Sequence, residues 1–197
     1  MTNIKALLNE LETKGIENDL HVAERRQKYL NITKGTGEFL SVMAKSIAAT
    51  RILEVGTSNG YSTIWLASAL NTQGHVTTIE YNLEKVAEAR ENFAQAGLED
   101  RITLMEGDAT QLIPCLEKPF DLVFLDAERD IYPSIIENII RLTRPGGLIV
   151  CDNAISHQEE LTPIMEYFCH LDGFTTHLVP VGKGEFVIHK GTAVSAS

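Results

Sequence analysis

The chain has 197 residues, of which 44% are hydrophobic and 22% are charged, a balance typical of a folded domain with a full core. Seventeen basic residues against 27 acidic ones leave a formal charge of −10, which argues against a large nucleic-acid surface. No segment approaches the ~18 apolar residues of a membrane span, and the N-terminus lacks the apolar core of a signal peptide. We therefore expect a cytoplasmic protein without a membrane partner.

Helices and strands are predicted to alternate along one domain that covers residues 1–197. Apolar residues at helical spacing predict two N-terminal helices, and residues 1–35 are expected to form a helical extension. Farther along, continuous apolar runs predict buried strands, and amphipathic segments between them predict helices. The strands are placed near 51–55, 75–80, 101–105, 120–125 and 147–152, and the helices near 61–70, 83–96, 131–143 and 157–171.

This alternation predicts an α/β fold, a doubly wound parallel sheet with helices on both faces. Two last strands, near 174–180 and 184–190, are joined by a glycine-rich turn and are predicted to form a hairpin. The small polar residues 191–197 predict a frayed tail. Because ligands bind at the carboxyl ends of strands in such sheets, residues at those ends are the candidates for a site.

A glycine turn follows the strand near 51–55 and leads into a helix, an arrangement that binds phosphate in nucleotide folds. Its glycines, Gly56 and Gly60, are spaced G-x-x-x-G, whereas a dinucleotide site requires G-x-G-x-x-G. The carboxylate of Glu54 lies two residues before the first glycine, where it would repel a pyrophosphate. The turn therefore predicts a site for a cationic or hydroxyl-rich ligand.

Two further carboxylates follow the neighbouring strands. Glu80 ends the strand near 75–80, where a carboxylate can accept hydrogen bonds from both hydroxyls of a ribose. Asp108 follows the next strand and can accept from an exocyclic amine such as that of adenine. A ribose and an adenine without phosphates, together with a positive charge, describe S-adenosylmethionine (SAM), which is the predicted cofactor.

With these residues in place, the chain resembles the class I SAM-dependent methyltransferases, and more closely the metal-dependent O-methyltransferases related to catechol and caffeoyl-CoA O-methyltransferases. The resemblance covers about residues 36–190 and rests on five motifs in order, EVGTSNGYST at 54–63, TIE at 78–80, GDA at 107–109, FDLVFLDAE at 120–128 and RPGGLIVCDN at 144–153. It implies a Rossmann-like, mostly parallel seven-stranded sheet with an antiparallel C-terminal hairpin, and a homodimer. The cofactor-binding residues that it implies are Glu54, Gly56, Thr57, Ser58, Tyr61, Ser62, Glu80, Tyr81, Asp108, Ala109 and Asp126.

A second set of polar residues closes the fourth and fifth predicted strands. Asp126 ends one, and Asp152 with Asn153 ends the other, so adjacent strand ends can bring three oxygen ligands together. Two carboxylates and an amide carbonyl suit a hard divalent cation such as Mg²⁺ or Ca²⁺, and the matching family positions hold a metal. The alternative is that Asp152 and Asn153 only turn the chain before Ser156-x-x-Glu159, which has the pattern of a capping box.

The chain departs from the family pattern just after Asp126. Many members carry Asp-x-x-Lys, whose lysine is proposed as the general base, whereas this chain has Arg129, which stays protonated. Either the metal lowers the hydroxyl pKa while Arg129 steadies the oxyanion, or another base serves, and His157 is the nearest candidate in the sequence. The alternative for His157 is an exposed position in the first turn of a helix. Asp126, Arg129 and His157 are the candidate catalytic residues.

These features predict methyl transfer from SAM to a hydroxyl of a small, catechol-like substrate, assisted by a divalent metal. Two alternatives stay open. One is methylation of a hydroxyl on a tRNA nucleoside, against which the charge of −10 counts. The other is a SAM-binding protein without catalysis, which only Arg129 suggests. Substrate specificity is expected in segments 15–36, 154–160 and 180–186.

Overall fold

A computed structural model describes residues 3–192 of the chain, so most of the predicted tail at 191–197 lies outside the described residues. Within them, no helix is both long and apolar enough to cross a membrane. The helices are α1 (Ile4–His21), α2 (Lys34–Ser46), α3 (Tyr61–Ala69), α4 (Leu83–Ala96), α5 (Ala109–Leu112), α6 (Tyr132–Leu142) and α7 (Gln158–Cys169). Short 3₁₀ turns are η1 (Arg25–Gln27), η2 (Glu99–Arg101), η3 (Ile113–Cys115) and η4 (Arg129–Ile131). The strands are β1 (Arg51–Val55), β2 (His75–Glu80), β3 (Ile102–Glu106), β4 (Phe120–Leu125), β5 (Thr143–Cys151), β6 (Phe174–Val179) and β7 (Glu185–Lys190).

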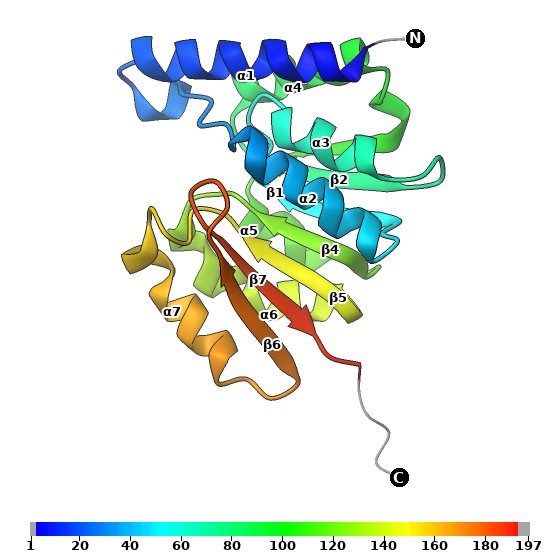
Figure 1. Ribbon diagram of the computed structural model, residues 1–197, viewed down its shortest axis with the longest axis vertical. Coiled ribbons are helices and arrows are strands. Elements are labelled where there is room, and N and C mark those ends of the chain that lie inside the picture. The colour runs from blue at the N-terminus through cyan, green and yellow to red at the C-terminus, as the bar shows by residue number, and fades with distance from the viewer. Residues whose placement is uncertain (1–2, 193–197) are drawn as a thin grey trace.

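All seven strands form one sheet in the order β3-β2-β1-β4-β5-β7-β6 (Figure 1). Strands β1 to β5 pair in parallel, and β7 runs antiparallel to both β5 and β6. The prediction of a mostly parallel sheet with a C-terminal antiparallel hairpin is therefore confirmed. The strand order reverses between β1 and β4, which is where doubly wound sheets open a crevice at their carboxyl edge.

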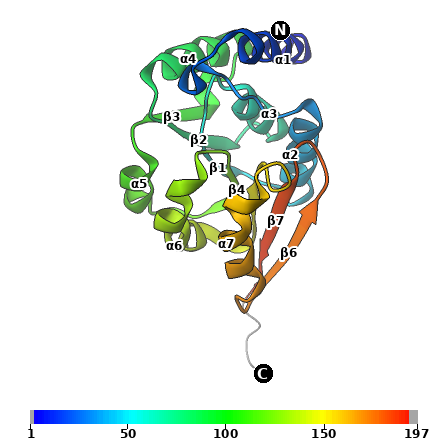
Figure 2. The same cartoon turned by 90° about the vertical axis from the view of Figure 1, so that its left-hand side faces the viewer.

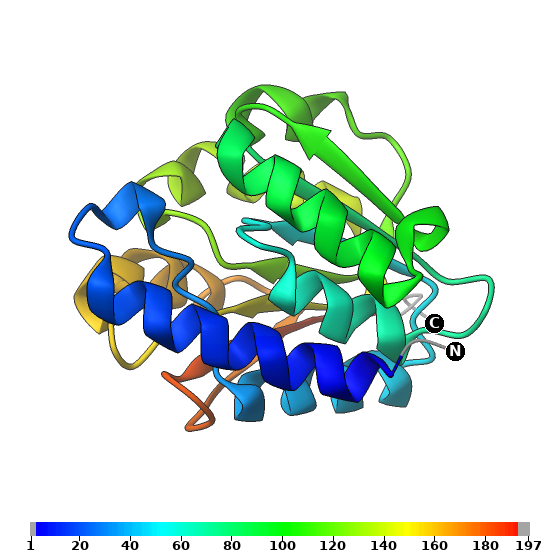
Figure 3. The same cartoon turned by 90° about the horizontal axis from the view of Figure 1, so that it is seen from above.

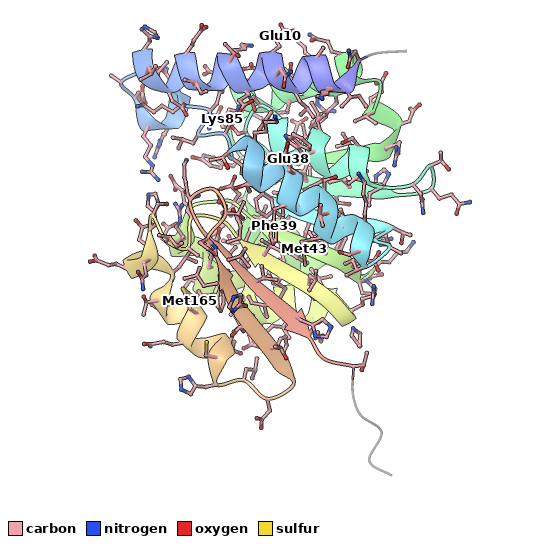
Figure 4. The ribbon with its side chains drawn as sticks, in the orientation of Figure 1. Glu10, Glu38, Phe39, Met43, Lys85 and Met165 are labelled. Atoms are coloured by element: carbon pink, nitrogen blue, oxygen red, sulfur yellow. The ribbon has the colours of Figure 1, made fainter. Side chains whose placement is uncertain are left out.

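Each face of the sheet is covered by its own set of helices, because successive strand residues point to opposite sides. Ile52, Leu122 and Val150 face the cluster that α1, α2, α3 and α4 complete, and Phe39 and Met43 of α2 pack against it (Figure 4). Leu53, Val123 and Ile149 face the other cluster, which α5, α6 and α7 complete (Figure 2). Helix α1 lies outermost on its side, against α3 and α4 (Figure 3).

Most element boundaries lie within two residues of the sequence-based expectation, and the starts of β5 and α7 are the two differences with a clear structural cause. Strand β5 begins at Thr143 rather than near 147, because Thr143 pairs with Phe120 before the register shifts. Helix α7 begins at Gln158, and its N-cap residue, His157, makes no side-chain capping bond. The predicted capping box is therefore wrong: the Ser156 hydroxyl contacts Asn153 and His157 instead of closing the helix end.

The packing of α2 gives a test of the fold. Leu40 is fully buried on this helix, whereas Val42, on the opposite side, is 63% exposed. We expect Leu40→Ala to lower the free energy of unfolding by about 2–5 kcal/mol, because it leaves a cavity in the core. Val42→Ala should change it by no more than about 0.5 kcal/mol. Urea denaturation followed by circular dichroism measures both, and equal losses in the two variants would contradict this packing.

Candidate functional site

A cavity of about 360 Å³ opens at the carboxyl ends of the parallel strands, and residues from η1 and the loop after it cover one side of it. Most of the sequence-predicted site residues line this cavity. They are Gly56, Thr57, Ser58, Ser62, Glu80, Tyr81, Asp108, Ala109, Asp126, Arg129, Asn153 and His157. Three predicted residues, Glu54, Tyr61 and Asp152, lie behind the lining.

The glycine turn allows β1 and β4 to approach closely at the cavity floor. Gly56 has a φ of 100°, and a Cβ there would collide with the backbone carbonyl of Asp126. Gly60 has a φ of 86° and caps α3, in a backbone conformation that favours glycine. Gly56 therefore lets the loop after β1 pass directly beside Asp126, the residue that follows β4.

Glu80 is held in place by backbone donors. One of its carboxylate oxygens accepts from the backbone N–H of Ser58 at 2.8 Å, and the other from the N–H groups of Tyr81 and Asn82 at 3.1 and 2.9 Å. The Ser58 hydroxyl in turn donates to the carbonyl of Tyr29 at 2.7 Å. Glu80 is thus oriented at the cavity wall, and the glycine turn is tied to the segment after α1.

The other end of the cavity is built by the loop after β3. Asp108 caps α5, since one of its oxygens accepts from the backbone N–H and the hydroxyl of Thr110, both at 2.8 Å. The buried methyl group of Ala109 and the half-exposed ring of Tyr81 lie on the same lining. These groups combine apolar surface with a carboxylate oxygen that is free of the cap, which suits a flat heterocycle with an amine.

Glu54 and Tyr61 depart from the arrangement expected for cofactor contacts. Glu54 faces the α3 side of the sheet because strand residues alternate, and its carboxylate accepts from the hydroxyls of Thr63 and Thr78. Tyr61 turns into the same core and packs edge-on against Trp65. Neither side chain reaches the cavity, and Glu54 lies behind Ser62, so the structure does not support direct cofactor contacts for this pair.

The predicted metal ligands come together where β4 and β5 end. The backbone N–H of Asp126 donates to Val55 at 2.9 Å and that of Asp152 to Leu125 at 3.1 Å, which sets the two residues side by side. Burial, and then the nearby Asp152, raise the pKa of Asp126 well above its usual range. The Asn153 amide donates to Asp152 at 2.6 Å, from a backbone with a φ of 66°.

Two adjacent carboxylates and an amide oxygen fit a divalent cation, which would relieve the repulsion between the acids. Within residues 3–192, no group of three or more histidine, cysteine or acidic side chains is arranged as a metal site. A cation here would therefore need the Asn153 oxygen together with oxygens from water or substrate.

Glu185 is a fourth buried acid that the sequence analysis missed. The register of β5 and β7 sets Cys151 opposite Phe186, so Glu185 lies across from Asp152. It is fully buried, accepts from the Thr36 hydroxyl at 2.9 Å and has a second oxygen without a partner among the described residues. Burial and the neighbouring Asp152 raise its pKa to about 10. The sequence signal that could have identified Glu185 is an acidic residue at the start of an otherwise apolar strand.

His157 and Arg129 lie beside the Asp126 and Asn153 end of the cavity. His157 is half-buried, and its Nδ1 lies 2.9 Å from the Ser156 hydroxyl. Burial, followed by the charge of Arg129, lowers the pKa of His157. The Arg129 side chain is only 8% exposed, its Nε has no hydrogen-bond partner within residues 3–192, and its nearest acid, Glu160, lies at 3.9 Å.

Several lining residues were not predicted individually. Lys85 of α4 (Figure 4) and Lys183 of the β6–β7 turn line the cavity, as does the segment from Arg25 to Ile32. Segments 15–36, 154–160 and 180–186, where specificity was expected, do contribute to the lining. Their individual residues could not be chosen from sequence, because such loops carry no periodic pattern.

Comparisons with known proteins give relatives for this arrangement. A profile of the O-methyltransferase family matches residues 6–163. A catechol O-methyltransferase of Niastella koreensis is 38% identical over 68% of this chain and 62% of its own length, and one of Mycobacterium tuberculosis is 45% identical over 60% and 54%. The matches thus span less than two thirds of these relatives. Among solved structures, the chain is similar to TomG from Streptomyces achromogenes, an O-methyltransferase involved in tomaymycin synthesis whose crystal structure is in complex with SAM. The TM-score is 0.80, and the sequences are 28% identical over 95% of this chain and 90% of TomG.

The buried Glu54 generates a pH prediction. Burial raises its pKa from 4.5 to about 7 in the folded protein, although hydroxyl donors favour the ionised form. Because the folded protein binds this proton more tightly than the unfolded chain, protonated Glu54 stabilises the fold. This contribution is full below the unfolded-state pKa and is lost as the pH rises through the folded-state pKa. We expect the free energy of unfolding to fall between about pH 5 and pH 8, with Glu54 contributing up to about 3 kcal/mol of that loss.

Urea denaturation at both pH values measures this loss in the wild type and in Glu54→Gln, which cannot titrate. The variant should lose less, whatever its starting stability. An exposed acid, Glu84→Gln, is the matched control and should lose as much as the wild type. Equal losses in the wild type and Glu54→Gln would refute the prediction.

Proposed function

Because the chain belongs to the O-methyltransferase family, we propose that it transfers a methyl group from SAM to a hydroxyl of a small, catechol-like substrate, with the help of a divalent cation. The observation that carries this proposal is one cavity lined by Glu80 and Asp108, which follow β2 and β3, and by Asp126 and Asn153, which follow β4 and β5 on the other side of β1. The names of the relatives support a catechol-like acceptor.

The cofactor would occupy the part of the cavity between the glycine turn and the loop after β3. Glu80, already oriented by three backbone donors, would accept from the ribose hydroxyls. Asp108 would accept from the adenine amine with the oxygen that the α5 cap leaves free. The crystal structure of the related TomG in complex with SAM supports SAM as the cofactor.

When bound, SAM supplies the methyl group and a divalent cation lowers the pKa of the acceptor hydroxyl. Asp126, Asp152 and Asn153 would hold the cation at the strand ends. Arg129, buried beside Asp126, would stabilise negative charge that develops on the acceptor oxygen. The main work of the protein is then to align the reacting groups in a site shielded from water.

His157 is the candidate that can accept a proton. The Ser156 hydroxyl has one hydrogen, and it lies within hydrogen-bond distance of both the Asn153 side-chain oxygen and Nδ1 of His157. When Ser156 donates to Asn153, Nδ1 of His157 must donate to Ser156, which leaves Nε2 unprotonated. The lowered pKa keeps the ring neutral at physiological pH, so Nε2 is then available as a base.

Cofactor binding is tested at Glu80. We expect Glu80→Ala to weaken SAM binding by about 1–3 kcal/mol, because a charged hydrogen-bond partner is lost. Isothermal titration calorimetry with SAM and with S-adenosylhomocysteine measures this loss, and NAD should not bind. Glu91→Ala, which changes an exposed acid of α4, is the control and should bind like the wild type. Wild-type affinity in Glu80→Ala would exclude the ribose contact.

Metal dependence is tested at Asp152. We expect Asp152→Asn, which keeps the side-chain volume but removes the charge, to raise the Mg²⁺ concentration for half-maximal activity by at least about tenfold. Direct Mn²⁺ binding, followed by electron paramagnetic resonance, should weaken in parallel. Asp172→Asn, at an exposed turn before β6, is the matched control. Full turnover in excess EDTA would show that no metal is needed.

A further inference from the structure

Three cationic side chains from distant parts of the chain line the same side of the cavity. They are Arg25 in η1, Arg129 in η4 and Lys183 in the β6–β7 turn, together called the cationic rim. All three lie near His157: the Lys183 carbonyl accepts from the backbone N–H of Ser156 at 3.0 Å, Arg129 lies 3.9 Å from Glu160 of α7, and Arg25 lines the same cavity. Figures 1 and 3 show η1, the start of α7 and the β6–β7 turn on one side of the molecule.

Two members of the rim have no acidic partner among the described residues, and the third, Arg129, is only partly neutralised by Asp126 and by Glu160 at 3.9 Å. Within residues 3–192, the side chains of Arg25 and Lys183 make no hydrogen bond or salt bridge. Arg129 is more telling, because its side chain is 92% buried and its Nε has no hydrogen-bond partner there. A buried N–H group without a hydrogen-bond partner is costly, which points to an anion that completes the site.

The acids on the cavity lining do not fill this role. Glu80 is engaged by backbone donors, and Asp108 caps α5. Glu128 also lines the cavity, but it is exposed and makes no salt bridge with a described residue. Asp126 is paired with Asp152. Glu160, the acid nearest to Arg129, is 55% exposed and lies 3.9 Å from Nε, beyond hydrogen-bond distance. On a chain with a net charge of −10, the rim is a local reversal of sign.

We infer that the methyl acceptor carries an anionic group, a carboxylate or a phosphate, close to its hydroxyls, and that the cationic rim binds this group. This inference rests on the proposed function and adds the substrate class. The exposed Arg25 and Lys183 would meet the anion at the cavity mouth, and the buried Arg129 would meet it at the inner end. His157 links the rim to Asn153 through Ser156, so the anion lies near the reacting hydroxyls.

A small anionic molecule fits these observations better than a nucleic acid. Affinity for nucleic acid grows with the number of phosphate contacts, and three cations on an otherwise acidic chain supply few. The alternative, that the cations are hydrated surface groups, suits Arg25 and Lys183 but not Arg129, whose side chain is only 8% exposed. The proximity of the rim to Asn153 also favours a compact substrate.

The test compares acceptors that share a diol and a ring but differ in charge. With Mg²⁺ and SAM in excess, 3,4-dihydroxybenzoate should have a kcat/KM at least about tenfold above that of 3,4-dihydroxybenzamide, since each exposed charge contact is worth about two- to fivefold and a buried one more. Comparing 3,4-dihydroxybenzyl phosphate with the benzoate shows whether the rim prefers a phosphate or a carboxylate, because the preferred anion gives the higher kcat/KM. The preference for the acid should shrink in high salt.

Variants connect the preference to the rim. Arg25→Gln and Lys183→Gln should each lower kcat/KM for the acid by about two- to fivefold while changing the amide by less than about twofold. Lys118→Gln removes the same charge at an exposed site outside the cavity and should change neither acceptor. Equal kcat/KM for acid and amide in the wild type would overturn the inference while leaving the proposed function intact.

Calorimetry keeps the inference testable if no probe is methylated. Acid and amide are then titrated into the protein with S-adenosylhomocysteine and Mg²⁺. Tighter binding of the acid, lost in the Arg25→Gln and Lys183→Gln double variant, would support the rim even though the proposed reaction had failed. Equal affinity, or no binding of either probe, would overturn it.

Discussion

The site depends on a row of backbone hydrogen bonds along the carboxyl edge of the sheet. The residue that follows each of four strands donates its N–H to a neighbouring strand: Gly56 to Ile79, Gly107 to Glu80, Asp126 to Val55 and Asp152 to Leu125, at 2.8–3.1 Å. These bonds set the start of each loop at the same level. The loops that follow these strands therefore line the same cavity, although the strands are far apart in the chain.

This edge carries an unusual concentration of buried acid. Glu54, Asp152 and Glu185 are at most 3% exposed, and Asp126 lies in contact with Asp152. Burying ionisable groups is costly unless they bind protons, cations or hydrogen-bond donors. For Glu54 the fold supplies hydroxyl donors, and for Glu185 it supplies the Thr36 hydroxyl. For Asp126 the nearby positive charges are Arg129 and Lys85, and burial beside Asp152 still disfavours its ionised form, a cost that a bound cation would relieve.

The charge distribution divides the cavity into two parts. Glu80 and Asp108 lie where a ribose and an amine would bind, whereas Arg25, Arg129 and Lys183 lie near His157, beside the end that Asp126 and Asn153 form. Positive and negative side chains within one cavity orient a ligand that carries both cationic and anionic groups, because each ligand group is repelled by protein charges of its own sign. The loops and turns that carry the cations vary more easily than strand ends, so they can adjust specificity without disturbing the sheet.

The sequence by itself determined the type of sheet, its C-terminal hairpin and the polar residues at the strand ends, because the periodicity of apolar residues and the spacing of glycines are local properties of the chain. It also showed that Arg129 stands where a lysine is usual. Only the tertiary structure decided which face each side chain takes: Glu54 and Tyr61 turn into a core, and Glu185 comes to lie opposite Asp152. The cationic rim likewise appears only in three dimensions. Its members are separated by about 50–100 residues in the chain and are joined by packing, which no local pattern records.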